Sequence, residues 1–239
     1  MLRLAALAWA LLASAAIAAP QGQARLGAYT AQFQTPTHRY GHAIMGDLPE
    51  WGRLCLTGPA TQACVTLPET AVFEDMAPRL ADLDHDGIPE MVVVESTMTQ
   101  GAALVVYRLD KTTLTRIPTP HIGRRNRWLA PAGIGDLDGD GRVEIAYVDR
   151  PHLAKVLRIW RYENGALHHV TDQPGLTNHR IGDEGIAGGL RTCDGTPEIL
   201  TANADWSQII ATRLTGGRTQ TRPLGRYSAT ALRRALSCR

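Results

Sequence analysis

Aromatic residues are scarce in this sequence, since Phe, Trp and Tyr make up 5% of its 239 residues and only two are phenylalanine. The apolar pattern is therefore carried by Ile, Val, Leu and Thr, a composition that favours strands over helices. Hydrophobic residues still amount to 44% of the chain, which argues against intrinsic disorder. We expect an all-β protein.

Long apolar runs are absent after residue 18, so we expect no transmembrane segment. Residues 1–18 begin with a positive residue, Arg3, continue with an apolar stretch over 4–17 and end in Ala16-Ile17-Ala18. This order is typical of a signal peptide, and the stretch is too short to span a bilayer. A buried N-terminal helix is the alternative, but the polar Gln21-Gly22-Gln23 follows directly. The pattern predicts a periplasmic or secreted protein.

Zinc-type cysteine spacing is also missing, because there is no C-x-x-C pair and no His at ligand spacing to a Cys. The four cysteines suit two disulfides in an exported chain, for which three pairings exist. Cys55 and Cys64 flank a turn-like stretch between two apolar runs, so we expect them to pair. That leaves Cys193 to pair with Cys238.

Neither sign of charge is in large excess, since 25 Lys and Arg stand against 23 Asp and Glu. Eight of the acids lie in two short motifs, so the rest of the chain is basic, which permits weak binding to anionic surfaces. For an exported protein we expect no nucleic-acid partner.

Those two motifs both read D-x-D-x-D-G-x-x-E, over residues 82–90 and 136–144. Four carboxylates in nine residues repel one another unless a cation lies between them, and a hard divalent ion with oxygen ligands, calcium above all, suits them. The backbone carbonyl at position 7 is the natural further ligand. We therefore predict two structural Ca²⁺ ions. The predicted ligands are Asp82, Asp84, Asp86, Ile88 and Glu90 in the first loop, and Asp136, Asp138, Asp140, Arg142 and Glu144 in the second.

Other interpretations of these motifs fit less well. An EF-hand needs Glu at position 12 and a following helix, whereas position 12 here is Val93 or Tyr147 within an apolar run. Magnesium prefers to keep its waters and suits four carboxylates poorly. A metal-free acidic turn is the remaining alternative, and two copies in register argue against it.

The motifs belong to a repeat, because Gly87, Gly141 and Gly195 stand 54 positions apart. A similar series of short apolar runs, each typical of a strand, follows every glycine. The predicted strands are 91–94, 103–109, 114–117 and 128–134 in one unit, 145–148, 156–162, 167–170 and 181–190 in the next, and 199–202 and 208–214 in the last.

Four short antiparallel strands per unit of this length predict a β-propeller over residues 19–227, with about four blades and five possible. A degenerate first unit precedes Asp82, with a first strand at 53–56, and residues 28–33 are expected to close the ring against the last blade. The third loop keeps only two carboxylates, so we expect no metal there. Residues 228–239 are predicted to form a helix packed on the propeller, with Ser228 as N-cap.

The motif followed by an apolar strand, at 82–94 and 136–148 with a worn copy at 190–202, resembles the FG-GAP/VCBS repeat family, which includes the integrin alpha-subunit propeller. The resemblance implies a calcium-stabilised β-propeller. It implies little about activity, because unrelated proteins share the motif.

Catalytic signatures are lacking, since no G-x-S-x-G, Walker or dinucleotide motif occurs. His168 and His169 are expected to face opposite sides of a strand, the stretch around His38 and His42 has no helical character, and His85 holds a non-ligand position in the first motif. We expect ordinary histidines and no enzyme.

Two surface clusters and the tryptophans remain as binding candidates. Arg124-Arg125-Asn126-Arg127-Trp128 is a basic cluster suited to polyanions, phospholipid or an acidic partner, and a solvated turn before a strand is the alternative. Arg180 with Asp183 and Glu184 forms either a pocket or a structural ion pair. The predicted sugar platforms of a lectin-like module are Trp51, Trp128, Trp160 and Trp206, with Trp160 expected in the core.

The resulting functional hypothesis is an exported, monomeric, non-catalytic scaffold or binding module for a protein or glycan partner. The alternative is a propeller-based hydrolase or lyase with an unrecognised active site.

Overall fold

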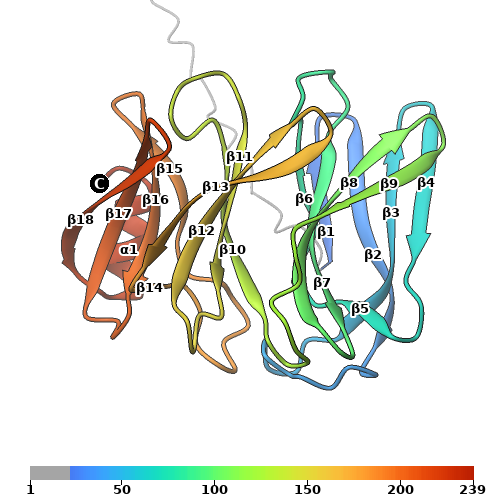
Figure 1. The fold of residues 1–239 in the computed structure, drawn as a ribbon, viewed down its shortest axis with the longest axis horizontal. Helices are drawn as coiled ribbons and strands as arrows, with labels where there is room; N and C mark the ends of the chain where they lie inside the picture. The colour runs from blue at the N-terminus through green and yellow to red at the C-terminus, as the bar shows by residue number, and fades with distance from the viewer. Residues whose placement is uncertain (1–21) are drawn as a thin grey trace, which may run out of the picture.

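The computed structural model describes residues 22–239, and the predicted signal peptide at 1–18 lies outside them. The described chain is all-β, with antiparallel strands in three sheets and one short helix (Figure 1). Val, Ile and Leu fill the inner strands, for example the fully buried Met91-Val92-Val93-Val94, as expected for strands covered on both faces. No helix within 22–239 has the length and apolarity needed to cross a membrane.

The first sheet has nine strands in the order β1-β2-β3-β5-β7-β8-β9, with β4 also paired to β3 and β6 to β7. Its strands are β1 (Gln23–Leu26), β2 (Tyr29–Thr37), β3 (Glu50–Gly58), β4 (Thr61–Thr66), β5 (Ala71–Phe73), β6 (Arg79–Ala81), β7 (Glu90–Thr97), β8 (Gly101–Asp110) and β9 (Thr113–Pro118).

The second sheet is a meander of four strands in the order β10-β11-β12-β13. Its strands are β10 (Leu129–Gly135), β11 (Glu144–Asp149), β12 (Val156–Glu163) and β13 (Ala166–Pro174). The third sheet has the order β14-β16-β17-β18 with β15 also paired to β16. Its strands are β14 (Leu176–Thr177), β15 (Gly189–Cys193), β16 (Thr196–Asn203), β17 (Gln208–Thr215) and β18 (Arg218–Arg226).

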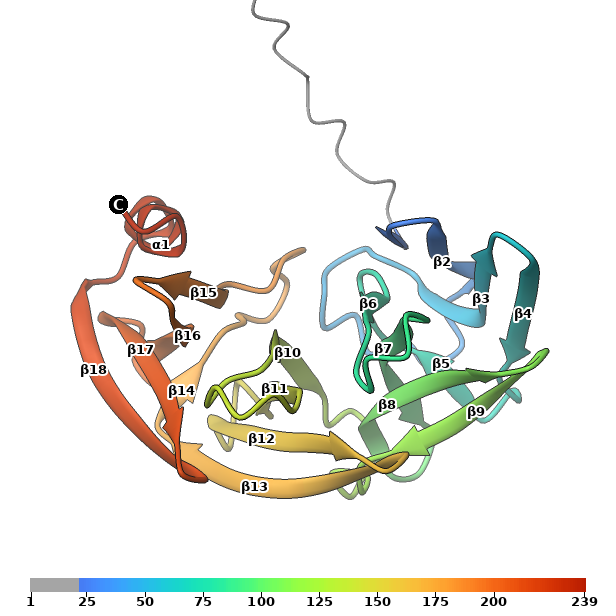
Figure 2. The same ribbon diagram turned by 90° about the horizontal axis from the view of Figure 1, so that it is seen from above.

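The sheets follow one another around an arc, with the first and third at its two ends (Figure 2). β10 contacts both β8 and β15, so the second sheet packs between the other two. The buried Val92, Leu104, Leu129 and Ile145 form one cluster that joins the first sheet to the second. Burial of these side chains stabilises the arrangement, at roughly 1.5–3 kcal/mol for each fully buried aliphatic side chain.

The predicted repeat agrees with the structure in most strands, because each predicted inner run lies within β7, β11 or β16. Two predictions are wrong. The predicted strand at 181–190 is mostly a loop, and β15 begins only at Gly189. Residues 28–33 do not close a ring against the last sheet, because β2 pairs with β1 and β3 in the first sheet. A sequence pattern identifies an apolar strand but not its partner, which the register of the whole sheet decides.

Both predicted disulfides are present, and they join Cys55 to Cys64 across β3 and β4 and Cys193 to Cys238. The second bond ties the end of β15 to the residues after helix α1 (Ala229–Leu236). Ser228 caps this helix as predicted, since its Oγ accepts a hydrogen bond from the Ala231 amide at 3.0 Å. Leu232 packs into the third sheet beside Leu200 and Ile209, so the helix covers that sheet.

Candidate functional site

The two acidic motifs form equivalent turns, the first between β6 and β7 and the second between β10 and β11. Both turns lie at the same end of the molecule, at the top in Figure 1. They also touch, because His85 Nε2 lies 3.1 Å from the carbonyl oxygen of Gly141. The structure therefore brings the two predicted metal loops side by side.

Matching backbone bonds shape both loops. The glutamate at position 9 accepts a hydrogen bond from the amide at position 2, between Glu90 and Leu83 at 2.8 Å and between Glu144 and Leu137 at 2.9 Å. The aspartate at position 1 accepts one from the glycine at position 6, at 3.0 Å in the first loop and 2.9 Å in the second. Gly87 has a φ of 85° and Gly141 one of 83°, which glycine adopts freely. These shared bonds explain why the motif repeats with its glycine.

In the first loop Asp82, Asp84 and Asp86 each offer a carboxylate oxygen, and these oxygens lie within 4.8 Å of one another. Glu90, the fourth carboxylate of this loop, is buried, with 1% of its surface exposed. Burial, together with the charges of Asp84 and Asp86, raises the pKa of Glu90 to about 7. The hydrogen bond from the Leu83 amide lowers this pKa, but by less than burial raises it. No ion pair to Glu90 exists within residues 22–239, so its charge has no partner among the described side chains.

The second loop gathers a different set, namely Asp136, Asp138 and Glu144. Asp140, the fourth predicted carboxylate ligand, turns instead to the guanidinium of Arg142 at 2.5 Å, a hydrogen bond that lowers the pKa of Asp140 to about 2. Arg161 on β12 enters the loop, with its Nε 2.5 Å from Glu144 and its Nη2 3.0 Å from Asp138. Burial raises the pKa of Glu144 even so. An arginine thus neutralises part of this loop.

The donor set fits a cation because each loop contains a buried oxygen with no hydrogen-bond partner. These oxygens are Asp82 Oδ1 in the first loop and Asp138 Oδ1 in the second. A buried carboxylate oxygen without a partner costs free energy, on the order of several kcal/mol for a charged group. Calcium accepts six to eight oxygen ligands and would satisfy both atoms.

The worn third copy has lost the loop as well as two of its four acids. β15 and β16 join through a two-residue turn at Asp194 and Gly195, whose φ values are 52° and 75° as in a type I′ hairpin. The equivalent glutamate, Glu198, is 2% exposed and lies against three arginines. Its shortest contacts are 2.5 Å to Arg191, 2.8 Å to Arg213 and 2.8 Å to Arg222.

The arginines therefore follow a graded series across the three units. Glu90 has no arginine partner, Glu144 has Arg161, and Glu198 has three. Sequence reasoning missed Arg161, Arg213 and Arg222 because they come from neighbouring strands outside the motif. It also missed Arg191, which stands at position 2 of the worn third copy. An arginine recurs in the second strand of each unit, at 108, 161 and 213. Of these three, only Arg161 and Arg213 form an ion pair with the glutamate of their unit among the described residues, so the recurrence alone does not predict the series.

The remaining candidates are placed as follows. Trp128 and Trp160 are buried, 2% and 8% exposed, so they offer no sugar platform. The ring of Trp206 is covered by the guanidinium of Arg180 at 4.2 Å. Asp183 and Glu184 form no ion pair with Arg180 among the described residues.

The histidines are less dispersed than expected. His42 Nδ1 lies 2.6 Å from Glu74, and His152 Nε2 lies 3.2 Å from His179. His42 and His152 both line one hollow at the end of the molecule opposite the metal loops. No sequence pattern predicts this grouping, because the residues come from three separate loops.

Comparison with known families bears on the first two units. Residues 82–147, which hold both acidic loops and the strands between them, match the model of the FG-GAP-like repeat. The chain carries an FG-GAP-like repeat. No curated protein matches the chain. The FG-GAP repeat suggests a propeller-type binding module, and the two disulfides fit an extracellular or secreted protein.

Proposed function

We propose that this chain is an exported calcium-binding repeat protein of the β-propeller type, a monomer that serves as a non-catalytic scaffold or binding module for a protein or glycan. The observation that carries the calcium part is the pair of unpartnered buried oxygens in the two FG-GAP loops. The first loop would hold the ion through Asp82, Asp84 and Asp86, with the Ile88 carbonyl and Glu90 completing the set. The second would use Asp136, Asp138 and Glu144, with Asp140 and the Arg142 carbonyl.

The two loops should differ in affinity. In the second loop an entering cation must displace Arg161 from Asp138 and Glu144 and draw Asp140 away from Arg142. The first loop contains no arginine, so binding there costs no such exchange. We therefore infer that the first loop is the tighter site.

The blade count belongs to the same proposal. The second sheet has the four strands of one blade, and the third has five, because β14 and β15 both pair with β16. The nine strands of the first sheet correspond to two further blades joined edge to edge. This gives about four blades. The calcium ions would hold the turns at one end of the inner strands β7 and β11, where a propeller presents its binding loops.

One observation favours the alternative of a hydrolase or lyase. The pairing of His42 with buried Glu74 is an arrangement that general-base sites use. No hydroxyl or thiol lies within hydrogen-bonding distance of His42 Nε2 among the described residues. Because a nucleophile to pair with this base is lacking there, we propose the non-catalytic role.

Thermal unfolding with and without calcium tests the metal. At ~1 mM calcium, a first site with a Kd of ~10⁻⁴ M should add about 1.4 kcal/mol of stability and the weaker second site less, so EGTA should lower Tm by a few degrees. Asp82→Asn should remove the larger share of this shift. Asp194→Asn, in the worn third turn, is the matched control and should leave it intact. An EGTA-insensitive Tm in the wild type would defeat the calcium proposal.

A glycan array and cross-linking to candidate exported proteins, each run with calcium and with EGTA, test the binding role. Calcium-dependent capture that Asp82→Asn abolishes would support a metal-ordered binding module. Turnover of an ester or glycoside library that His42→Gln abolishes would instead establish the catalytic alternative.

A further inference from the structure

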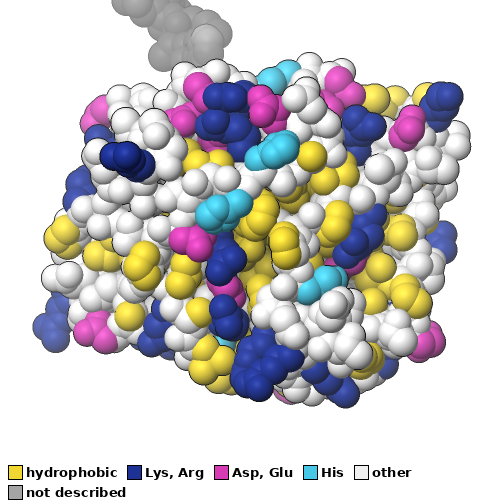
Figure 3. Space-filling model, in the orientation of Figure 1, with side chains coloured by type: hydrophobic (Ala, Val, Ile, Leu, Met, Phe, Trp, Pro, Cys, Tyr) yellow, Lys and Arg dark blue, Asp and Glu magenta, His cyan; other side chains and the backbone are white. Residues whose placement is uncertain are grey.

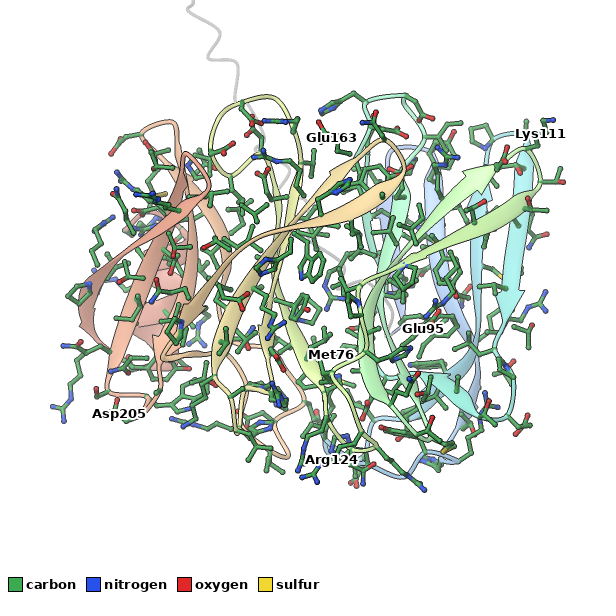
Figure 4. All side chains as sticks on the ribbon, in the orientation of Figure 1. Met76, Glu95, Lys111, Arg124, Glu163 and Asp205 are labelled. Carbon is green, nitrogen blue, oxygen red and sulfur yellow. A yellow bond between two sulfur atoms is a disulfide. The ribbon has the colours of Figure 1, made fainter. Side chains whose placement is uncertain are left out.

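The end of the molecule opposite the metal loops carries an arginine-rich surface. Figure 4 places Arg124 at this end and Glu163, whose carboxylate binds Arg142 of the second metal loop, at the other. Figure 3 shows Lys and Arg side chains gathered at the same lower edge. Two hollows of about 240 and 470 Å³ open there, and both are lined by Arg127, Arg150 and Leu153. Arg124 lines the larger one.

Two of these arginines lack a counter-charge. Arg150 binds Asp149 through two nitrogens, at 2.7 and 3.1 Å. Arg124 and Arg127 form no ion pair with any residue of 22–239. Two guanidinium groups facing a hollow without an acid repel each other unless an anion joins them.

The loop that carries the arginines is fixed in place, which distinguishes it from a solvated charged face. The Asn126 amide donates to the Tyr40 hydroxyl at 2.8 Å, and Arg125 donates to the Tyr40 carbonyl at 2.8 Å. Gly101 lies directly beneath the loop, since a Cβ there would stand 2.2 Å from the Arg124 carbonyl oxygen. Arg124 and Arg127 are thus presented by a braced turn, so little backbone entropy is lost when they bind a ligand.

Two histidines and two apolar side chains complete the smaller hollow. Glu74 occupies Nδ1 of His42, so Nε2 is the nitrogen left for a ligand. Burial lowers the pKa of His152 to about 4, so this ring is neutral and offers a hydrogen bond. Leu153 and Ile181 line the rim and are 61% and 71% exposed, the most exposed large apolar side chains of the described chain.

We propose that these two hollows, which share Arg127, Arg150 and Leu153, together bind a phosphate group carried on an apolar moiety. Arg124, Arg127 and Arg150 would hold the phosphate, and Leu153 and Ile181 the apolar part. The planar guanidinium fork matches phosphate oxygens. The forks of Arg124 and Arg127, together with the Nη1 that Arg150 does not use on Asp149, suit a group with several oxygens better than a carboxylate with two. A lipid headgroup and a soluble phosphate ester share this chemistry. The site is separate from the metal loops and does not depend on calcium.

Calorimetric titration of the purified protein with phenyl phosphate, inorganic phosphate and benzoate tests the assignment. Phenyl phosphate should bind saturably and more tightly than benzoate. Arg127→Gln should weaken it by roughly tenfold to a hundredfold, as expected for lost charged hydrogen bonds. Arg218→Gln removes the same charge from an exposed position on β18 and should change the affinity less than twofold. Unchanged Tm values in both variants exclude unfolding as the cause.

Co-sedimentation with phosphatidylglycerol vesicles, against phosphatidylcholine vesicles as control, distinguishes the two sources. If the double variant Leu153→Ser, Ile181→Ser abolishes binding to phosphatidylglycerol vesicles, the phosphate is that of a lipid. Phenyl phosphate binding without vesicle binding assigns it to a soluble ester. Absence of saturable binding to every phosphate probe would overturn the proposal. So would equal affinity for benzoate, or equal losses in Arg127→Gln and Arg218→Gln.

Discussion

The stability contributed by Glu198 should disappear in acid. Burial by itself would raise the pKa of this carboxyl, but hydrogen bonds from Arg191, Arg222 and Arg213 outweigh it and lower the pKa to about 2. Because the folded pKa lies below the ordinary value of about 4.5, the ionised form stabilises the fold above that pH. The contribution is lost as the pH falls from about 4.5 to about 2.

The magnitude follows from this difference. The ionised Glu198 should contribute on the order of 3 kcal/mol at pH 7, falling to about 1 kcal/mol at pH 3. Arg213 and Arg222 are partly exposed, 43% and 50% for their side chains, so solvent screening makes this an upper figure.

Urea unfolding of the wild type and of Glu198→Gln measures the effect. Both proteins are measured in EGTA, so that calcium binding does not contribute to the difference in their free energies of unfolding. The stability gap should be largest at pH 7 and shrink at pH 3, while the exposed Glu184→Gln should show no gap at either pH. A gap of the same size at both pH values would refute the reasoning, because it would arise from packing and not from charge.

Three further predictions concern other parts of the fold. Replacing Cys193 and Cys238 with Ser should lower the free energy of unfolding by about 4 kcal/mol, against about 2.6 kcal/mol for Cys55 and Cys64. The reason is that the disulfide closing the longer loop removes more entropy from the unfolded chain. Urea unfolding measures both losses, and a larger loss for the short loop would contradict this account. Arg161→Gln should destabilise the protein by roughly 3–5 kcal/mol in EGTA. The loss should be smaller in saturating calcium, because the ion then neutralises Glu144 in place of the arginine. Equal losses in both buffers would contradict a cation in this loop. Gly101→Ala should lower stability by at least 1–3 kcal/mol, because φ is 71° there and the added Cβ would clash with the Arg124 carbonyl. Gly185→Ala is the control, because a Cβ there would have no neighbour within 4 Å. Thermal unfolding that gives the two variants equal losses would contradict the close approach at Gly101.

The repeat could be predicted because its signals are local. The spacing of Gly87, Gly141 and Gly195 and the apolar runs after them located β7, β11 and β16, since burial on both faces requires continuous apolar residues. Pairing of the cysteines followed from their spacing and their even number. The acidic loops were equally visible, because a tight turn places alternate residues around one centre.

The partners of those elements could not be predicted. The pairing of β2 with β3, and the loop where a strand was expected at 181–188, depend on sheet register, which no short window of sequence contains. The entry of Arg161 into the second loop could not be predicted either, because this arginine comes from a separate strand. The turn of Asp140 toward Arg142 is local, but the motif alone does not indicate whether Asp140 faces a metal or the neighbouring arginine.

The sequence by itself determined an all-β repeat chain with two acidic turns, two disulfides and a capped terminal helix, because each of these rests on residues close together or on a count. Only the tertiary structure decided which carboxylates lack a counter-charge, since arginines arrive from neighbouring strands. It also decided that arginines and histidines from separate loops meet in one hollow opposite the metal loops. Charge is felt through space over a few ångströms, whatever the separation along the chain.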